Sequence, residues 1–322
     1  MTKPFAIGVD IGGTKIAAGV VDRAGHVLGR YTTQAHAEQP PAAVISTVIE
    51  AFKKVLKKTG VSTDEIAAVG VGFPGNTNGC DGIVLASSNL PAWDRYPLRD
   101  VLSEKIGLPV ILDNDTNMGV VGERQFGAGR GVANLCYMTV STGLGIGIMV
   151  NGKVYAGHAG TAGEVGHVVV EPQGAVCSCG KRGCVMAYAS GIGISRMAYE
   201  QVDAGVATNL RELMPPDRRR YPVEVVVAAA KEGDQVASDI LNTAARYTGI
   251  GLSIVVQVLS PEVIVVGGGL THMGALLMEP ALAAMREHTQ QELWDFVRVV
   301  PWQLGEDLGV LGGAARVFAE YD

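Results

Sequence analysis

VDIGGTKIAAGVVDRAGHV, residues 9–27, and VSTGLGIGIMVNGKV, residues 140–154, share one pattern of residue types. In each, a glycine-rich turn follows a strand-like apolar run, and a second apolar run, a polar turn and a further run come after it. Strand-like and helix-like segments alternate along the rest of the chain, which is typical of α/β proteins. Because one supersecondary unit occurs twice, we predict an α/β fold with two similar lobes.

Apolar spacing predicts the elements around these two units. Residues 5–9, 16–21 and 27–32 are expected to form a meander of strands. Val44, Val48, Phe52 and Val55 recur at helical spacing, so we predict a helix that starts near Pro40 and stops at Gly60. Further expected elements are strands at 66–72, 110–113 and 146–150, a loop at 73–82, helices from about 116, over 235–259 and over 309–321, and a strand that ends at Gly269.

Length and charge exclude several classes of protein. A chain of 322 residues, 48% of them hydrophobic, is long enough for two domains, because single cores stop growing near about 250 to 300 residues. The net charge of −6 disfavours a nucleic-acid partner. No stretch resembles a signal peptide or a membrane span, so we expect a cytoplasmic protein that does not contact membranes.

Three of the five cysteines lie close together, in a stretch that also contains a histidine. An odd number of cysteines in a chain expected to be cytoplasmic argues against a disulfide framework. A metal or redox role remains for the cluster. Cys80 and Cys136 lie apart from it, and we expect them to be packing thiols.

Two glycine turns are candidates for phosphate binding. DIGGTK, residues 10–15, exposes backbone N–H groups in a concave turn, and Asp10 can hold a hydrated Mg²⁺. A tight hairpin that requires positive φ is the alternative explanation. STGLG, residues 141–145, has the matching position in the second unit, and its glycines are not a dinucleotide fingerprint, because a strand is expected to follow them. Gly267, Gly268 and Gly269 end a strand, where bare backbone can lie against an adenine or ribose, or simply turn into a helix.

DNDTN, residues 113–117, follows a strand at the edge where open α/β sheets bind their ligands. An aspartate there can accept a proton from a sugar hydroxyl while neighbouring asparagines orient the sugar. Capping of the next helix is the alternative role for any one of these residues. SSNLPAW, residues 87–93, adds hydroxyl and amide groups, and we expect Trp93 to pack in the core.

These stretches together resemble the ROK family (repressor, open reading frame, kinase) of sugar kinases, within the actin-like ATPase superfamily. The resemblance covers essentially the whole chain. It also rests on the motifs GFPG (72–75), NLPAW (89–93), GEVGH (163–167), CSCGKRGC (177–184), AYASG (187–191) and VVGGG (265–269). It implies a two-lobed actin-like ATPase (ribonuclease H-like) fold with mixed sheets and a substrate cleft between the lobes. Residues 1–117 would form a small lobe, rejoined by about 305–322, and residues 118–304 a large lobe with the zinc loop and nucleotide contacts.

The resemblance implies ATP-dependent phosphorylation of a hexose, with glucose converted to glucose 6-phosphate as the favoured reaction. Asp115 would be the general base, and Asp10 would organise Mg²⁺. The residues implied at the nucleotide are Gly12, Gly13, Thr14, Lys15, Thr142, Gly143, Gly267, Gly268 and Gly269. The residues implied at the sugar are Gly75, Ser88, Asn89, Asn114, Glu164 and His167.

The resemblance also assigns the cysteine cluster to one structural Zn²⁺. Its ligands would be His167, Cys177, Cys179 and Cys184, whose H-x9-C-x-C-x4-C spacing supplies a closed tetrahedral set. Met186 departs from the family pattern, in which a glutamate that bonds sugar hydroxyls commonly stands two residues after the last cysteine. Methionine is a weak acceptor. Either the substrate is less polar near its anomeric carbon, or another group replaces the glutamate, or the sugar binds weakly.

Other substrates and functions stay open at this point. N-acetylmannosamine, mannose, fructose, allose or a C7-cyclitol could replace glucose as acceptor, and polyphosphate could replace ATP, although no additional basic patch indicates it. A repressor of this family would need a DNA-binding domain before Asp10, and only nine residues precede it. A non-catalytic sugar sensor would lack the base, whereas Asp115 is present. Family habit predicts a homodimer.

Overall fold

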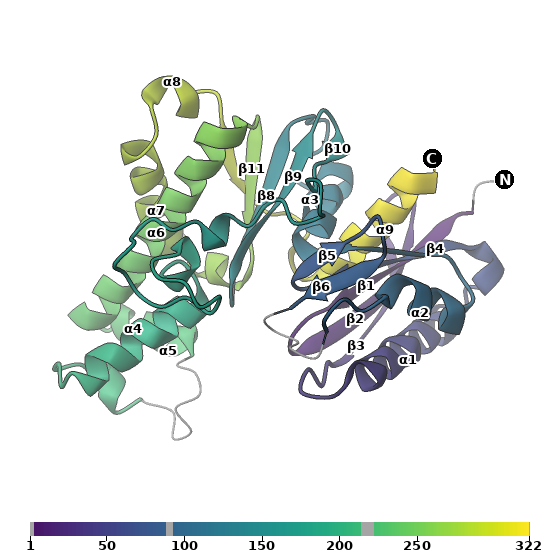
Figure 1. Ribbon diagram of the computed structural model, residues 1–322, viewed down its shortest axis with the longest axis horizontal. Coiled ribbons are helices and arrows are strands. Elements are labelled where there is room, and N and C mark those ends of the chain that lie inside the picture. Colours follow the sequence, from purple (N-terminus) through teal and green to yellow (C-terminus); the bar gives the residue numbers. More distant parts are fainter. Residues whose placement is uncertain (1–2, 88–92, 214–221, 322) are drawn as a thin grey trace. The chain divides into compact units, whose positions relative to one another are not determined.

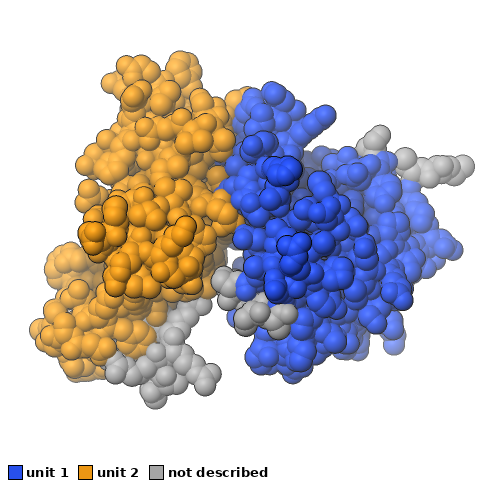
Figure 2. Space-filling view, viewed as in Figure 1, with its two compact units in different colours: residues 1–137, 147–163, 301–322 blue, residues 138–146, 164–300 orange. Residues whose placement is uncertain are grey.

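The computed structural model of the chain describes residues 3–87, 93–213 and 222–321. Internal contacts divide it into two compact units, which Figure 2 colours separately. Unit 1 comprises Met1–Tyr137, Gly147–Gly163 and Pro301–Asp322, and unit 2 comprises Met138–Ile146 and Glu164–Val300. The resemblance predicts lobes with boundaries near residues 117 and 305, defined as bodies that move against each other. Internal contacts do not measure such motion, so these lobe boundaries stay a prediction.

Unit 1 is built around a sheet with the strand order β3-β2-β1-β4-β7 (Figure 1). Strands β1, β2 and β3 form the predicted antiparallel meander, and β4 and β7 run parallel to β1. The carboxyl ends of β1, β4 and β7 therefore meet at one edge of the sheet. The bounds are β1 Phe5–Ile11, β2 Lys15–Asp22, β3 Val27–Gln34, β4 Ile66–Phe73 and β7 Val110–Asn114.

Helices cover both faces of this sheet, because successive strand residues point to opposite sides. Ile7 and Val9 of β1 lie in one apolar core with the buried residues of α1 (Pro41–Thr59). Between them, Gly8 faces α9 (Leu308–Tyr321), and a Cβ atom at Gly8 would collide with the α9 backbone. The missing side chain lets α9 lie directly against the strands.

Helix α3 is fastened to the C-terminal part of unit 1 by a fully buried glutamate. Glu123 accepts the N–H of Ala128 on Oε2 at 2.7 Å. It accepts the N–H groups of Gln303 and Leu304 on Oε1 at 3.0 and 3.1 Å. These three bonds connect the end of α3 (Asp115–Phe126) to the segment that leads into α9.

The second sheet has the strand order β10-β9-β8-β11-β12. The predicted long helix, α6, belongs to unit 2 and packs along α7. The strand bounds are β8 Leu135–Val140, β9 Leu144–Val150, β10 Lys153–Val154, β11 Val263–Gly267 and β12 Arg298–Pro301. The helix bounds are α4 Gly191–Asp203, α5 Val223–Lys231, α6 Gln235–Leu259, α7 Ala275–Glu287 and α8 Gln291–Trp294. Within the described residues, no helix is both long and apolar enough to cross a membrane.

The structure corrects two of the expected elements. The loop expected at 73–82 contains the strand β5 (Asn76–Asn78), which pairs with β6 (Ile83–Ala86) in a small sheet of its own. The strand expected to end at Gly269 stops at Gly267, because Gly268 has a φ of 94° that ends the extended backbone. Helix α2 (Leu98–Ile106) and helices α4, α5, α7 and α8 were not predicted.

Candidate active site and metal centre

One row of paired residues crosses the carboxyl edge of the first sheet. Asp10 of β1 pairs with Gly72 of β4, which in turn pairs with Asp113 of β7. Paired residues point to the same face, and here that face is covered by α9. Gly309 of α9 touches Asp10, and Arg316 Nε lies 3.7 Å from Asp113 Oδ2. About two strand spacings of 4.8 Å therefore separate the two aspartates, so DIGGTK and DNDTN share one edge.

The first glycine turn presents accessible backbone. Gly13, Thr14 and Lys15 are exposed, and the N–H of Gly12 donates to the carbonyl of Lys15 at 2.9 Å. Neither glycine has positive φ, so a hairpin that requires it does not explain the pair. Burial raises the pKa of Asp10, and the charge of Lys15 opposes that rise. An oxygen ligand at the base of an open turn suits a hard cation such as Mg²⁺.

The two carboxylates of DNDTN have different surroundings. Asp113 is buried and accepts bonds from Asn117 Nδ2 and the N–H of Asn114, both at 2.8 Å. Asp115 is partly exposed and stands at the first position of α3, where its Oδ1 accepts the N–H of Thr116 at 2.9 Å. Asp113 is therefore engaged inside the protein, whereas Asp115 is accessible.

Asn114 is the N-cap of α3, so the capping alternative applies to this residue. Its Oδ1 accepts the N–H of Thr116 at 2.8 Å, and its Nδ2 donates to the carbonyl of Gly75 at 2.8 Å. The structure thus brings Gly75 and Asn114 together. Ser88 and Asn89, expected at the sugar, lie outside the described residues. Trp93 is buried in the core, as predicted.

The second glycine turn lies beside the triple glycine within unit 2. The N–H of Ser141 donates to the carbonyl of Gly143 at 2.8 Å, which closes the turn that also contains Thr142. A Cβ atom on Gly268 would lie 2.6 Å from the carbonyl oxygen of Val140, and one on Gly269 would lie 3.5 Å from Ser141 Oγ. The turn that contains Thr142 and Gly143 and the triple glycine 267–269, both predicted to bind the nucleotide, are therefore neighbours.

The histidine and the three clustered cysteines converge on one point. Their four potential ligand atoms, from His167, Cys177, Cys179 and Cys184, all lie within 4.8 Å of one another. Cys179 Sγ lies 3.7 Å from Cys184 Sγ, and Cys177 Sγ lies 3.6 Å from His167 Nδ1. A tetrahedral zinc with Zn–S bonds of about 2.3 Å requires sulfur atoms about 3.8 Å apart.

The thiol chemistry also suits a cation. Burial and the neighbouring thiols of Cys179 and Cys177 raise the pKa of Cys184 to about 12, and a bound cation would oppose that rise by stabilising the thiolate. The four residues therefore fit Zn²⁺ in number, type and spacing.

His167 connects this cluster to Glu164. Its Nδ1 faces Cys177, whereas its Nε2 lies 3.8 Å from Glu164 Oε2. Burial raises the pKa of Glu164, and the charge of His167 opposes that rise. One imidazole can thus bind a metal through Nδ1 and orient a carboxylate or a ligand hydroxyl through Nε2.

Met186 lies in a one-turn 3-10 helix, Val185–Ala187, directly after Cys184. Its side chain is buried, and a Cβ atom on Gly143 would lie 3.2 Å from its Sδ. The thioether therefore packs against the second glycine turn.

Two acidic residues before α9 were missed by the sequence analysis. Lys15 Nζ donates to Glu306 Oε2 at 2.6 Å, and Arg30 donates to Asp307 Oδ1 at 2.7 Å. The stretch LGEDLG, residues 304–309, gave no distinctive signal, because acidic residues are common just before a helix, where its dipole favours them. Glu306 thus pairs with Lys15 of the first turn, and Asp307 pairs with Arg30 of β3.

Comparison with known proteins agrees with these features. The sequence profile of the ROK family matches residues 6–320. A glucokinase from Streptomyces coelicolor is 36% identical over 96% of this chain and 96% of its own. A xylose repressor from Caldicellulosiruptor bescii is 29% identical over 98% of this chain and 78% of its own.

The structural comparison confirms the predicted fold class. A ROK family glucokinase from Streptomyces griseus, solved in complex with glucose and AMPPNP, has a TM-score of 0.82 and 33% identity, over 96% of this chain and 98% of that one. Matched in fold and along nearly its whole length, the chain belongs to the ROK family and is a sugar kinase of that family.

Proposed function

We propose that this protein transfers the γ-phosphoryl group of ATP to a hexose, with glucose as the favoured acceptor. The observation that carries the proposal is the accessible carboxylate of Asp115 at the N-terminus of α3, close to a buried Asp113 whose Oδ1 accepts two hydrogen bonds. A helix N-terminus favours a carboxylate in its ionised form. That form accepts protons, as a general base must.

In the proposed reaction, Asp115 accepts the proton of the sugar 6-hydroxyl while the hydroxyl oxygen attacks the γ-phosphorus. A new O–P bond forms, and the bond between the γ-phosphorus and the bridging oxygen breaks, so its electron pair leaves on ADP. Backbone N–H groups of residues 12–14 and 142–143 would bind phosphate oxygens. Asp10 would hold Mg²⁺, which when bound neutralises phosphate charge. Lys15 would add a positive charge at the first turn.

Glu164 and His167 would bind sugar hydroxyls, together with Gly75 and Asn114. His167, the three clustered cysteines and a structural Zn²⁺ would form one unit beside Glu164. Because the ligand geometry fits a closed tetrahedral site, this metal would hold the segment in place and take no part in the chemistry.

A second candidate acceptor follows from Met186. The resemblance implies a glutamate that bonds the sugar near its anomeric carbon, and an apolar, buried thioether stands there instead. A substrate that differs from glucose near C1 or C2, such as mannose or N-acetylmannosamine, would lose less from that replacement than glucose does.

Sugar-dependent ADP release tests the proposal. Purified protein is assayed with ATP and Mg²⁺ against glucose, mannose, N-acetylmannosamine, fructose, allose and a C7-cyclitol, with Asp115→Asn protein as the control for contaminating kinases. We expect the highest kcat/KM with glucose. A higher value with another sugar corrects the acceptor, and no sugar-dependent release above the control refutes the kinase. Polyphosphate in place of ATP tests the donor, and light scattering tests the predicted homodimer.

A further inference from the structure

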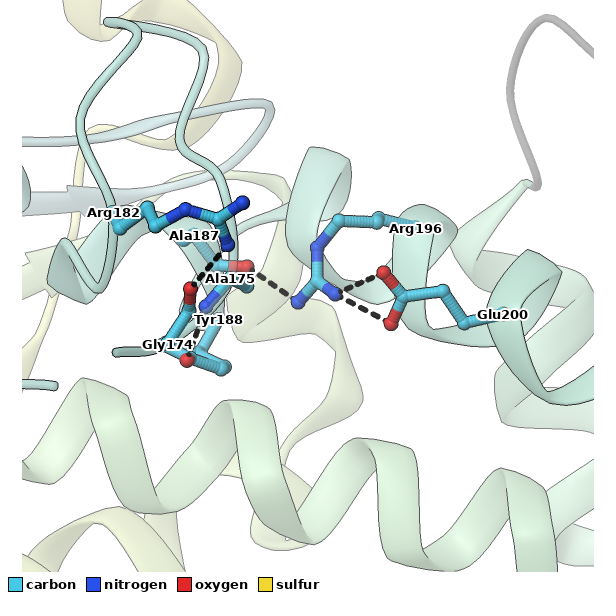
Figure 3. Close-up of polar contacts among 7 residues, drawn as sticks. All are labelled: Gly174, Ala175, Arg182, Ala187, Tyr188, Arg196 and Glu200. Atoms are coloured by element: carbon cyan, nitrogen blue, oxygen red, sulfur yellow. Dashed lines mark hydrogen bonds and ion pairs between the residues drawn. The ribbon is translucent and has the colours of Figure 1, made fainter. Parts of the chain in front are cut away.

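Tyr188 reaches back to the loop that carries the cysteines. Its hydroxyl oxygen accepts the N–H of Ala175 at 2.8 Å, two residues before Cys177 (Figure 3). Gly174 permits this approach, because a Cβ atom there would collide with the hydroxyl. Arg182 holds the same turn from within the loop, by donating to the carbonyl of Gly174 at 3.2 Å. The hydroxyl of Tyr188 therefore fixes one side of the metal-binding loop.

The ring of Tyr188 is itself held by two helices. It stacks on Tyr247 of α6, with ring centroids 4.0 Å apart and an interplanar angle of 14°. Arg196 of α4 places its guanidinium carbon 5.7 Å from the ring centroid and donates to the carbonyl of Ala187 at 3.2 Å. Glu200, one turn further along α4, holds Arg196 through both carboxylate oxygens at 2.6 Å (Figure 3). Stacking and the ion pair limit ring motion, so the hydroxyl has a defined position.

The residues on either side of Tyr188 contact the second glycine turn. Met186 packs its sulfur against Gly143, as described above. The N–H of Gly191 donates to the carbonyl of Ser141 at 2.8 Å, and the N–H of Ile192 donates to that of Thr142 at 3.4 Å. One short segment, residues 186–192, therefore touches the metal-binding loop through the Tyr188 side chain, and the glycine turn through its backbone and the Met186 side chain.

We propose that Tyr188 is a positioning residue that couples the metal-binding loop to the second phosphate-binding turn. Loss of the metal, or of the Tyr188 hydroxyl, then loosens residues 141–143 and weakens nucleotide binding. The inference rests on the proposed function, in which Thr142 and Gly143 bind phosphate. It extends the role of the metal from the sugar side, next to Glu164, to the nucleotide side of the reaction.

The expected effect follows from one hydrogen bond. Tyr188→Phe keeps the ring and its stacking but leaves the N–H of Ala175 without its partner. A neutral hydrogen bond of this kind corresponds to about a 2- to 12-fold change in an equilibrium constant. We expect a rise of that size in the Kd of the nucleotide and a comparable acceleration of metal loss.

The experiment compares the zinc-loaded wild-type protein with two substituted proteins, and then repeats the nucleotide titration on zinc-free protein. Tyr188→Phe is compared with wild type and with Tyr155→Phe, a matched change at a tyrosine that is 54% exposed and lies in unit 1. The Kd of a fluorescent N-methylanthraniloyl derivative of ADP is measured by titration. The rate of zinc transfer to the chelator 4-(2-pyridylazo)resorcinol is measured on the same samples. Wild type and Tyr188→Phe are then titrated again after zinc removal.

Coupling makes three results mandatory. Tyr188→Phe must raise the Kd and speed zinc transfer, Tyr155→Phe must change neither, and zinc removal must raise the wild-type Kd while shrinking the effect of Tyr188→Phe. Two outcomes overturn the coupling and leave the proposed kinase intact. In the first, Tyr188→Phe does not change the Kd of the nucleotide. In the second, Tyr188→Phe raises that Kd by the same factor with and without zinc, so the two effects are independent. Failure of the wild type to bind the ADP derivative overturns both the coupling and the proposed kinase.

Discussion

Replacement of Glu123 by glutamine tests the connection between α3 and the segment before α9. The carboxylate is fully buried and accepts three backbone N–H groups, from Ala128, Gln303 and Leu304. A glutamine has one acceptor oxygen and one NH₂ group in the same space. If its oxygen retains the bonds to residues 303 and 304, its NH₂ group faces the N–H of Ala128, which now lacks an acceptor.

The magnitude follows from these contacts. Hydrogen bonds to a charged group stabilise by about 1.5 to 3 kcal/mol and neutral ones by about 0.5 to 1.5 kcal/mol, so the two retained bonds each lose about 1 kcal/mol. The unsatisfied N–H of Ala128 costs about 1 to 3 kcal/mol more. We therefore expect Glu123→Gln to lower the free energy of unfolding by about 3 to 5 kcal/mol.

Urea denaturation at pH 7, followed by far-ultraviolet circular dichroism, measures that free energy. Glu50→Gln is the matched control, because Glu50 is exposed on α1 and its only described ion pair, with Lys54, is 4.0 Å long. Such a pair contributes about 0.5 kcal/mol or less. Hydrogen exchange should also accelerate in Glu123→Gln alone, most at residue 128, which loses its acceptor, and less at residues 303 and 304, whose bonds are weakened. A loss of stability no larger than that of Glu50→Gln would refute the role given to the three hydrogen bonds of Glu123.

Four further changes have defined outcomes. Asp115→Asn should lower kcat by about 10²- to 10⁴-fold with little change in sugar affinity, because it removes the proton acceptor alone; near-normal kcat in steady-state assays would remove the residue from that role. Cys179→Ser should release zinc and lower Tm, as metal analysis and calorimetry will show, and wild-type protein without zinc would end that account. Met186→Glu should raise kcat/KM on glucose by about 10- to 150-fold, because a charged acceptor bonds the sugar. If the six acceptors of the ADP-release assay keep the same order of kcat/KM, that expectation is contradicted. Asp234→Asn should destabilise at pH 7, and its effect should shrink as the pH falls below about 4. Hydrogen bonds from Ala237 and Thr208 outweigh burial and hold the pKa of Asp234 below its usual value, so the stabilisation by its carboxylate is complete above about pH 4 and is lost as the pH falls through the folded pKa. Urea midpoints at several pH values will show this loss.

Local sequence determined the elements whose cause lies within a few residues. The meander after residue 5 and the helix that ends at Gly60 follow from spacing and turn chemistry, and so does the 25-residue α6. The cysteine and histidine spacing likewise predicted a cluster that the fold assembles within 4.8 Å. Such features need only short-range geometry, because ligands and turn residues lie near one another in the chain.

Residue type alone did not distinguish the two aspartates of DNDTN, because both carry the same group two residues apart, and Asp115 was assigned as the base only through the family resemblance. The tertiary structure supplies the physical difference between them: β7 places Asp113 under α9, near Arg316, whereas Asp115 starts α3 and stays accessible. The bond between Lys15 and Glu306 joins residues 291 positions apart, and Tyr188 contacts Ala175 across a folded loop. Burial and charge at a site are sums over neighbours brought together by packing, and residue types along the chain do not specify those neighbours.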